Sequence, residues 1–167
     1  MSNETISLIT NLTLTLSFIV ALVFGIIQVR AVARDRRERL TLDTLRNLQT
    51  RDFIELMQFI ISHDLPSDRE GFRSLPADEQ VIVLAFAQEM ESLGILVAEG
   101  LIDIELVDKT IGSLVTTAWE KYTKAILDIR DKQPDPFLCE YFQWLAERID
   151  LRMREHPRKP FYAKRTG

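Results

Sequence analysis

The sequence has few of the residues that form covalent frameworks or bind metals. Its 167 residues include one cysteine, Cys139, and two histidines, His63 and His156. A single thiol excludes an intramolecular disulfide framework. Cys139 stands beside Glu140 and Tyr141 in the sequence, and we interpret it as a buried packing residue rather than a nucleophile. The histidines have neither Glu-x-x-His nor His-x-x-x-His spacing, so we predict no metal site.

The motifs of common enzymes are also missing. The stretch Thr110–Ser113 lacks the further glycines and the lysine of a phosphate-binding loop, and there is no serine-hydrolase elbow. We therefore predict a protein that is not an enzyme, with no catalytic residue, no cofactor and no small-molecule ligand. Four carboxylates flank Gly94, where two of them could meet as an acid/base pair, although solvated helix faces explain them more simply: Glu89, Glu91, Glu99 and Asp103.

Charge is missing from one long stretch near the N-terminus. The 25 residues between Glu4 and Arg30 carry no charge. A helix of that length rises about 37 Å, which is enough to cross a hydrocarbon core of about 30 Å with some tilt. We therefore predict a transmembrane helix over roughly residues 5–29. The alternatives are a buried core helix and a cleaved signal peptide; Ala31–Ala33 offers a small-x-small site, but the charges lie on the wrong side for cleavage.

Basic residues follow this uncharged run and give it a predicted orientation. The N-terminal flank has only the α-amino group and Glu4, whereas five arginines come directly after the run. Because lysine and arginine are enriched on the cytoplasmic side of a span, we predict the N-terminus outside and the C-terminal domain in the cytoplasm. The membrane-orienting residues are Arg30, Arg34, Arg36, Arg37 and Arg39.

Small and polar side chains share one face of the predicted span. At 100° per residue they fall within an arc of about 120°. Ser17, Ala21 and Gly25 have the small-xxx-small spacing that lets two helix backbones approach, and Asn11 and Gln28 can donate hydrogen bonds across such a contact. We predict a helix–helix interface here; tolerance of Ser and Thr by lipid, or a water-lined pore, would also account for the pattern. The predicted interface residues are Ser7, Thr10, Asn11, Ser17, Ala21, Gly25 and Gln28.

Beyond the span, apolar residues recur at three- and four-residue intervals, which is typical of helices. This pattern continues to about Ser62, with a fresh start that Thr50 could cap. The polar stretch from there to Arg73 is predicted to be a loop. Pro76 lies at the start of a helix that is apolar nearly all round, so we expect that helix in the middle of a bundle. Gly94 is predicted to be its C-cap.

Two further helices complete the predicted domain. Asp103 is the expected N-cap of a helix that runs to about Asp131, where Pro136 and its neighbours stop it. The last helix is expected from Phe137 to about Met153. The sequence therefore predicts an all-α fold, with one N-terminal transmembrane helix followed by a helical bundle of four or five helices.

Net charge changes sign along the chain. It is +2 over residues 1–39, −11 over residues 40–151 and +5 over residues 152–167. We predict a transmembrane anchor (1–29), a basic juxtamembrane helix (30–49), an acidic helical domain (50–151) and a basic tail (152–167). The tail can lie on anionic headgroups or on its own domain; a protein partner ranks next and nucleic acid last. Its basic residues are Arg152, Arg154, Arg158, Lys159, Lys164 and Arg165.

Four short segments carry a resemblance to a known family. They are Leu45–Phe53, Glu91–Val97, Gly100–Asp103 and Tyr141–Arg148. Together they resemble an uncharacterised bacterial family of single-span membrane proteins with a cytoplasmic helical domain of unknown function. The resemblance covers nearly the whole chain and implies a bacterial inner (cytoplasmic) membrane. It brings no activity with it.

These features predict a non-enzymatic membrane anchor, scaffold or accessory subunit that associates through the small and polar face of its span. The expected partners are membrane lipid and either further copies of the chain or other membrane-protein subunits; nucleic acid is not expected. Two alternatives stay open. One is a membrane-tethered enzyme with an acidic site near Gly94, and the other is a pore-forming or effector oligomer.

Overall fold

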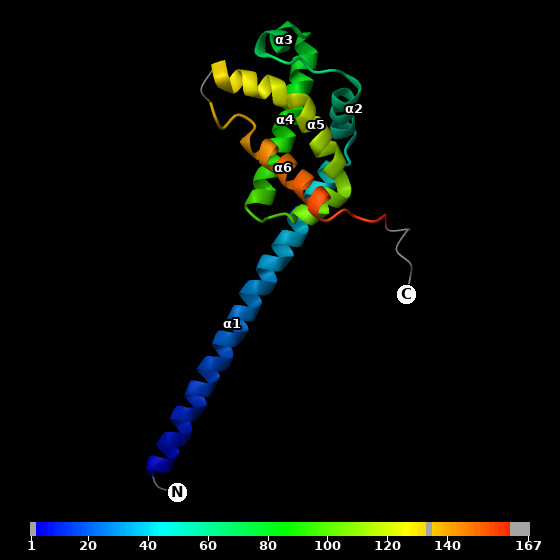
Figure 1. Cartoon of the computed structure of the whole chain (residues 1–167). Coiled ribbons are helices and arrows are strands. Elements are labelled where there is room, and N and C mark those ends of the chain that lie inside the picture. Colours follow the sequence, from blue (N-terminus) through cyan, green and yellow to red (C-terminus); the bar gives the residue numbers. More distant parts are fainter. Residues whose placement is uncertain (1–2, 133–134, 161–167) are drawn as a thin grey trace. The chain divides into compact units, whose positions relative to one another are not determined.

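The computed structural model describes residues 3–132 and 135–160, apart from the side chains of residues 4–6 and 8–10. The chain divides into two compact units, Met1–Leu42 and Asp43–Gly167. All the described elements are helices (Figure 1): α1 (Asn3–Asn47), α2 (Arg51–Ser62), α3 (Arg69–Ser74), α4 (Ala77–Ala98), α5 (Ile104–Lys132) and α6 (Glu140–Glu155). The predicted all-α fold, with a long apolar helix followed by a bundle, is confirmed.

Helix α1 is continuous for 45 residues. It therefore contains both the uncharged run and the five arginines. Every side chain from residue 11 to residue 39 is exposed. The hydroxyls of Thr15 and Ser17 each donate to a carbonyl one turn earlier, at Asn11 and Thr13, over 2.8 Å. Within its own unit, this part of α1 has no packing partner for its apolar side chains.

Helix α2 is held at both ends. The hydroxyl of Thr50 accepts a hydrogen bond from the Phe53 N–H (3.3 Å), which confirms the predicted start. At the other end, the Lys121 ammonium of α5 donates to three carbonyl oxygens, those of Ile60 (2.9 Å), Ile61 (2.7 Å) and His63 (2.8 Å). These carbonyls have no partner inside the helix, so a cation at this position is favourable.

The stretch predicted to be a loop before Arg73 contains the short helix α3, so that prediction was wrong in part. The Asp68 carboxylate caps α3 by accepting from the Gly71 N–H (2.7 Å). The carboxylate of Asp128 in α5 accepts from the Arg69 N–H (3.1 Å). Six residues are too few to show an apolar period, so only the cap could have indicated this helix.

The prediction that Gly94 caps α4 was wrong, because the helix continues to Ala98. A Cβ at Gly94 would lie 2.6 Å from the carbonyl carbon of Tyr141 and 2.9 Å from its Cβ. Glycine is therefore required by the close approach of α6. The turn that ends α4 comes at Gly100, which has φ 64° and donates its N–H to the Val97 carbonyl (3.0 Å).

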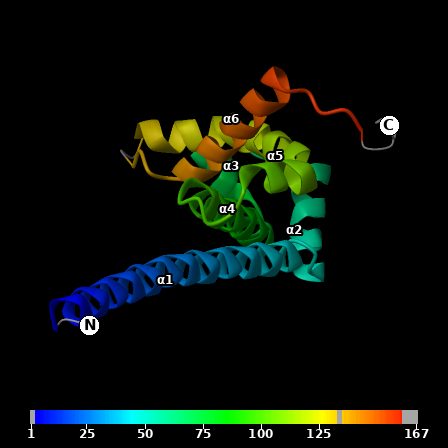
Figure 2. The same cartoon turned by 90° about the horizontal axis from the view of Figure 1, so that it is seen from below.

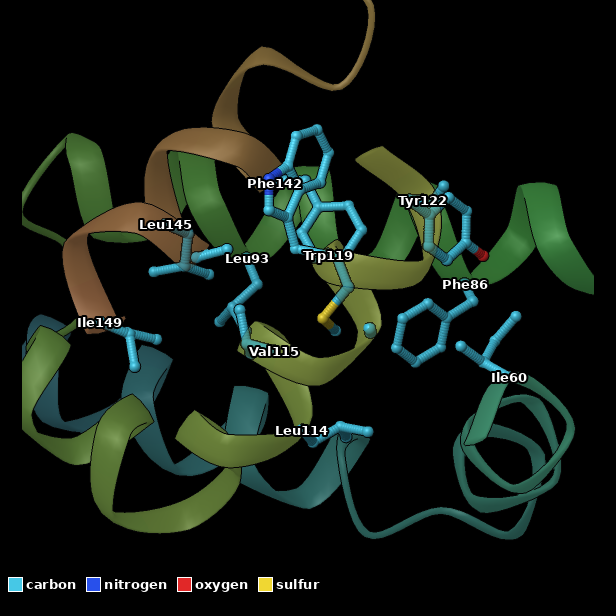
Figure 3. Close-up of a cluster of buried hydrophobic side chains, with 14 of the residues drawn as sticks. Ile60, Phe86, Leu93, Leu114, Val115, Trp119, Tyr122, Phe142, Leu145 and Ile149 are labelled. Atoms are coloured by element: carbon cyan, nitrogen blue, oxygen red, sulfur yellow. The ribbon is translucent and has the colours of Figure 1, made fainter. Parts of the chain in front are cut away.

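Helix α4 packs against both α2 and α6 (Figure 2), as its all-round apolar character predicted. The buried Phe142 ring of α6 lies among rings from α4 and α5 (Figure 3). Its centroid is 5.1 Å from that of Trp119, 5.6 Å from that of Tyr122 and 6.3 Å from that of Phe86. The Tyr122 hydroxyl donates to the Val83 carbonyl over 2.7 Å. One aromatic cluster thus joins the three longest helices of the domain.

Candidate functional site

The predicted interface residues of α1 are exposed wherever the structure describes their side chains. This holds for Ser7, Asn11, Ser17, Ala21, Gly25 and Gln28. The side chain of Thr10 lies outside the described part of the chain. The face is therefore open in the single chain and available to a partner.

A groove follows the small residues of this face. Ala21 and Gly25 line it, and a Cβ placed on Gly25 would meet no atom within 4 Å. The larger side chains that line the groove lie on one flank of the predicted face, and the sequence pattern did not mark them as part of an interface: Leu22, Ile26, Val29 and Arg30. The small residues therefore leave a depression that a second helix can fill.

The polar side chains on this face differ in whether they have a hydrogen-bond partner within the chain. The Ser17 hydroxyl is satisfied by its own helix, so it can face lipid without a partner. In the part of the chain that the structure describes, the side-chain amides of Asn11 and Gln28 make no hydrogen bond. An amide without a partner costs free energy in hydrocarbon, so these two side chains favour a helix–helix contact more than the hydroxyl does.

The five arginines that were predicted to orient the span all lie exposed on α1, just beyond the apolar run. Arg34 forms an ion pair with Glu38 one turn later (Nε to Oε1, 3.0 Å). Exposed pairs of this kind contribute little to stability. The arginines are therefore free to interact with groups outside the chain.

The carboxylates around Gly94 have separate structural roles. Glu91 accepts hydrogen bonds from the backbone N–H groups of Tyr141 (3.2 Å) and Phe142 (2.8 Å). It thereby caps α6 from another helix, because Cys139 at the N-cap makes no side-chain bond there. Glu89 accepts a hydrogen bond from the Asn47 amide. Glu99 is the exposed C-cap residue of α4, and Asp103 accepts from the Glu105 N–H.

Cys139 is half-buried and is the one described non-glycine residue with a positive φ, 55°. Its pKa is raised from 9.0 to about 11, first by burial and then by the charge of Glu91, against a smaller opposite effect of Arg130. It lines an apolar cavity of about 90 Å³ together with Tyr122 and Leu138. A neutral thiol on an apolar wall is consistent with a packing residue.

Neither histidine stands among other ligating groups. His63 stacks on Phe59, with ring centroids 4.2 Å apart, and His156 is the C-cap residue of α6. Across residues 3–132 and 135–160, the structure groups no three His, Cys, Asp or Glu side chains in a way that could hold a metal ion.

The basic tail begins inside α6 and continues past its end. Arg154 pairs with Asp150 (2.6 Å), whereas Arg158 reaches the buried Asp108 of α5 (Nη2 to Oδ1, 3.4 Å). Sequence analysis did not single out Asp108, because a charged residue on a helix is usually solvated. Lys159 is exposed, and Lys164 and Arg165 lie outside the described residues.

A family model for DUF4760, a domain of unknown function, matches residues 15–149. The chain belongs to this family. The match begins within α1 and ends in α6, so it includes much of the apolar helix as well as the domain. The predicted likeness to an uncharacterised family is thereby confirmed. Searches of curated proteins and of solved structures gave no match.

Among the residues that the structure describes, two helical stretches are long and apolar enough to cross a membrane: Asn11–Asn47 of α1, and α4. Helix α4 packs against α2 and α6 and carries seven buried residues, as core helices of soluble domains do. The apolar part of the stretch in α1 contains no buried residue, and the stretch lies near the N-terminus. By these properties it is either a membrane span or a signal sequence.

Proposed function

We propose that this member of the family is a non-enzymatic, single-pass membrane anchor or accessory subunit of the bacterial inner membrane. Its N-terminus lies outside, and its helical domain lies in the cytoplasm. It joins a second copy of itself or another membrane protein through the small and polar face of α1.

The exposed apolar surface of α1 carries this proposal. Thirteen large apolar side chains between Leu12 and Val32 have exposed fractions of 46–70%. Full burial of such a side chain is worth about 1.5–3 kcal/mol. A surface of this length is strongly unfavourable in water and favourable in a bilayer, and the uncharged run before Arg30 is long enough to cross one.

The family match and the flanking charges support the anchored, oriented form of the proposal. The matched region runs from residue 15 without a break into the domain. This favours a helix that stays with the domain over a leader that is removed. The arginines from Arg30 to Arg39 stand at the domain side of the run, which favours a cytoplasmic domain.

The groove at Ala21 and Gly25 supports the association. Close approach of two helices allows van der Waals contact along the backbone, and neighbouring amides such as Gln28 can then donate across the contact. Because a Cβ at Gly25 meets nothing in the chain itself, larger side chains there leave the single helix unchanged. A loss of association in such variants can therefore be assigned to the interface.

The test is in-membrane crosslinking of the full chain, followed by copurification in mild detergent to identify what is crosslinked. The variant carries Ala21→Leu and Gly25→Leu, and the matched control carries Val23→Leu and Ile27→Leu on the opposite side of α1. We expect the variant to lose its crosslinked product and the control to keep it. Equal crosslinking in both would contradict the interface.

Membrane insertion and orientation are tested separately. We expect the full chain to remain in the membrane fraction after carbonate extraction. In right-side-out vesicles of the inner membrane, we also expect protease to digest the domain only after the vesicles are permeabilised. Release by carbonate would contradict the span, and digestion of the domain in intact spheroplasts would contradict the orientation.

A further inference from the structure

Asp108 is a charged side chain in a buried position on α5. Its side chain is only 4% exposed, and its Oδ1 makes no hydrogen bond within the described structure. Gly112 follows one turn later, where a Cβ would lie 2.7 Å from that oxygen. A carboxylate in such a position needs a nearby positive charge to remain ionised at low cost.

Arg158 supplies this charge from outside the helical bundle. Its Nη2 lies 3.4 Å from Asp108 Oδ1 and donates to the Asp108 backbone carbonyl over 2.9 Å. Arg158 follows Pro157, beyond the end of α6. Its side chain is 44% exposed, so water and other solutes reach the guanidinium while it is bound.

A second cation lies near the same end of the helix pair. Arg152 of α6 has a buried Nε without a hydrogen-bond partner. The pKa of Glu105 is lowered chiefly by Lys109 and further by Arg152 and Arg158, so both arginines lie near the first turns of α5. Asp108 faces the same end of α6, because a Cβ at Gly112 would lie 2.7 Å from Asp108 Oδ1 and 3.0 Å from the Cε of Met153, the residue after Arg152.

We propose that the basic segment after α6 binds anionic phospholipid, and that Asp108 holds this segment on the domain until the phosphate of such a lipid takes Arg158. The inference rests on the proposed membrane anchoring, which keeps the domain and this segment tethered to a bilayer. A guanidinium binds phosphate through two parallel hydrogen bonds, a better geometry than its 3.4 Å contact with Asp108. Exposed Lys159 adds to the attraction of the segment for an anionic surface, and exposed Arg154 lies just before the segment, in the last turn of α6.

The experiment measures the position of the segment by electron paramagnetic resonance on the full chain in lipid nanodiscs. Spin labels are placed at Thr110→Cys and Pro160→Cys, both exposed, in a Cys139→Ala background. We expect a short label distance in pure phosphatidylcholine. In discs that also contain phosphatidylglycerol, we expect a second, longer distance whose share rises with the phosphatidylglycerol content.

Three variants separate the contact between Arg158 and Asp108 from general effects of charge. Arg158→Gln is expected to show the long distance in both lipids, and Asp108→Asn should show it already in phosphatidylcholine. Arg154→Gln removes one positive charge without touching Asp108, so its distance in phosphatidylcholine should equal that of the parent. Because Arg158→Gln changes a half-exposed side chain beyond the end of α6 and leaves Asp108 itself in place, it also serves if Asp108→Asn does not fold.

The remaining outcomes each overturn the inference. A chain that enters the discs but shows the same distance in both lipids has no lipid-sensitive segment. Separation by inorganic phosphate alone in phosphatidylcholine discs would assign Arg158 to a soluble anion instead of a membrane. A chain that does not coelute with the discs would refute the proposed anchoring as well, so the two failures are distinguishable.

Discussion

Gly94 of α4 lies directly against the backbone of Tyr141 in α6. There is no room for a side chain, because a Cβ at Gly94 would come within 2.6 Å of the Tyr141 carbonyl carbon. The two helices approach closely here, and Glu91, one turn earlier in α4, reaches the first N–H groups of α6. The packing and the capping of α6 therefore depend on the same short stretch of α4.

We expect Gly94→Ala to lower the free energy of unfolding of the domain by about 1–3 kcal/mol, because α6 must shift away from α4. Urea denaturation followed by tryptophan fluorescence measures this, because the buried Trp119 becomes exposed when the domain unfolds. Gly25→Ala is the matched control, since its Cβ meets nothing within 4 Å. If the two variants were equally stable, the close approach at Gly94 would not be a constraint.

Removal of the Glu91 carboxylate should loosen the start of α6. We expect Glu91→Ala to cost about 0.5–2 kcal/mol, the usual range for loss of an N-terminal cap. Hydrogen exchange should become faster at the amides of Tyr141 and Phe142. Glu147→Ala, which removes an exposed carboxylate bonded to the Gln143 amide, should leave those amides unchanged. Unaltered exchange in Glu91→Ala would contradict the capping role.

Lys121 is expected to secure the end of α2. Lys121→Met removes three hydrogen bonds from a charged donor to backbone carbonyls. One hydrogen bond to a charged group contributes about 1.5–3 kcal/mol. Because water replaces the lost donors, we expect the free energy of unfolding to fall by about 1.5–3 kcal/mol in total. Hydrogen exchange should quicken in the last turn of α2. The exposed Lys124→Met is the control and should leave that turn unaffected.

The raised pKa of Cys139 predicts a slow, pH-dependent reaction with alkylating agents. With a pKa of about 11, the thiol stays neutral at pH 8. Its alkylation rate should keep rising with pH up to about pH 11, whereas the rate of a thiol with the ordinary pKa of 9.0 levels off near pH 9. The folded state holds this proton more tightly than the unfolded state does, so Cys139 should make stability fall as pH rises from about 9 to 11. A Cys139→Ala variant should lose this part of the decline. Alkylation at pH 8 as fast as in the urea-unfolded chain would show that the prediction is wrong.

Local signals were enough to predict most of the helices. The start of α2 at Thr50 and of α4 after Pro76 follow from cap chemistry within a few residues. The central position of α4 follows from apolar residues on all its sides. Each of these signals depends on neighbours in the chain, which is why the sequence alone conveys it.

Contacts between distant residues could not be predicted in this way. A glycine near the end of an apolar helix has the same local appearance whether it ends the helix or admits another backbone, and Gly94 does the second. Glu91 was one of four carboxylates in a candidate acidic site, but its partners lie about fifty residues later, at Tyr141 and Phe142. The partner of Asp108 is likewise distant in the chain, because Arg158 follows it by fifty residues.

The capping of α6 by Glu91 also bears on the order of folding. The N–H groups that begin α6 are satisfied by a residue of α4, which leaves the ribosome about fifty residues earlier. A sixteen-residue helix is only marginally stable by itself in water. We therefore expect α6 to gain its structure last, on a surface of α4 and α5 that is already formed. Because synthesis starts at the N-terminus, α4 and α5 are made before α6, the helix that packs on them.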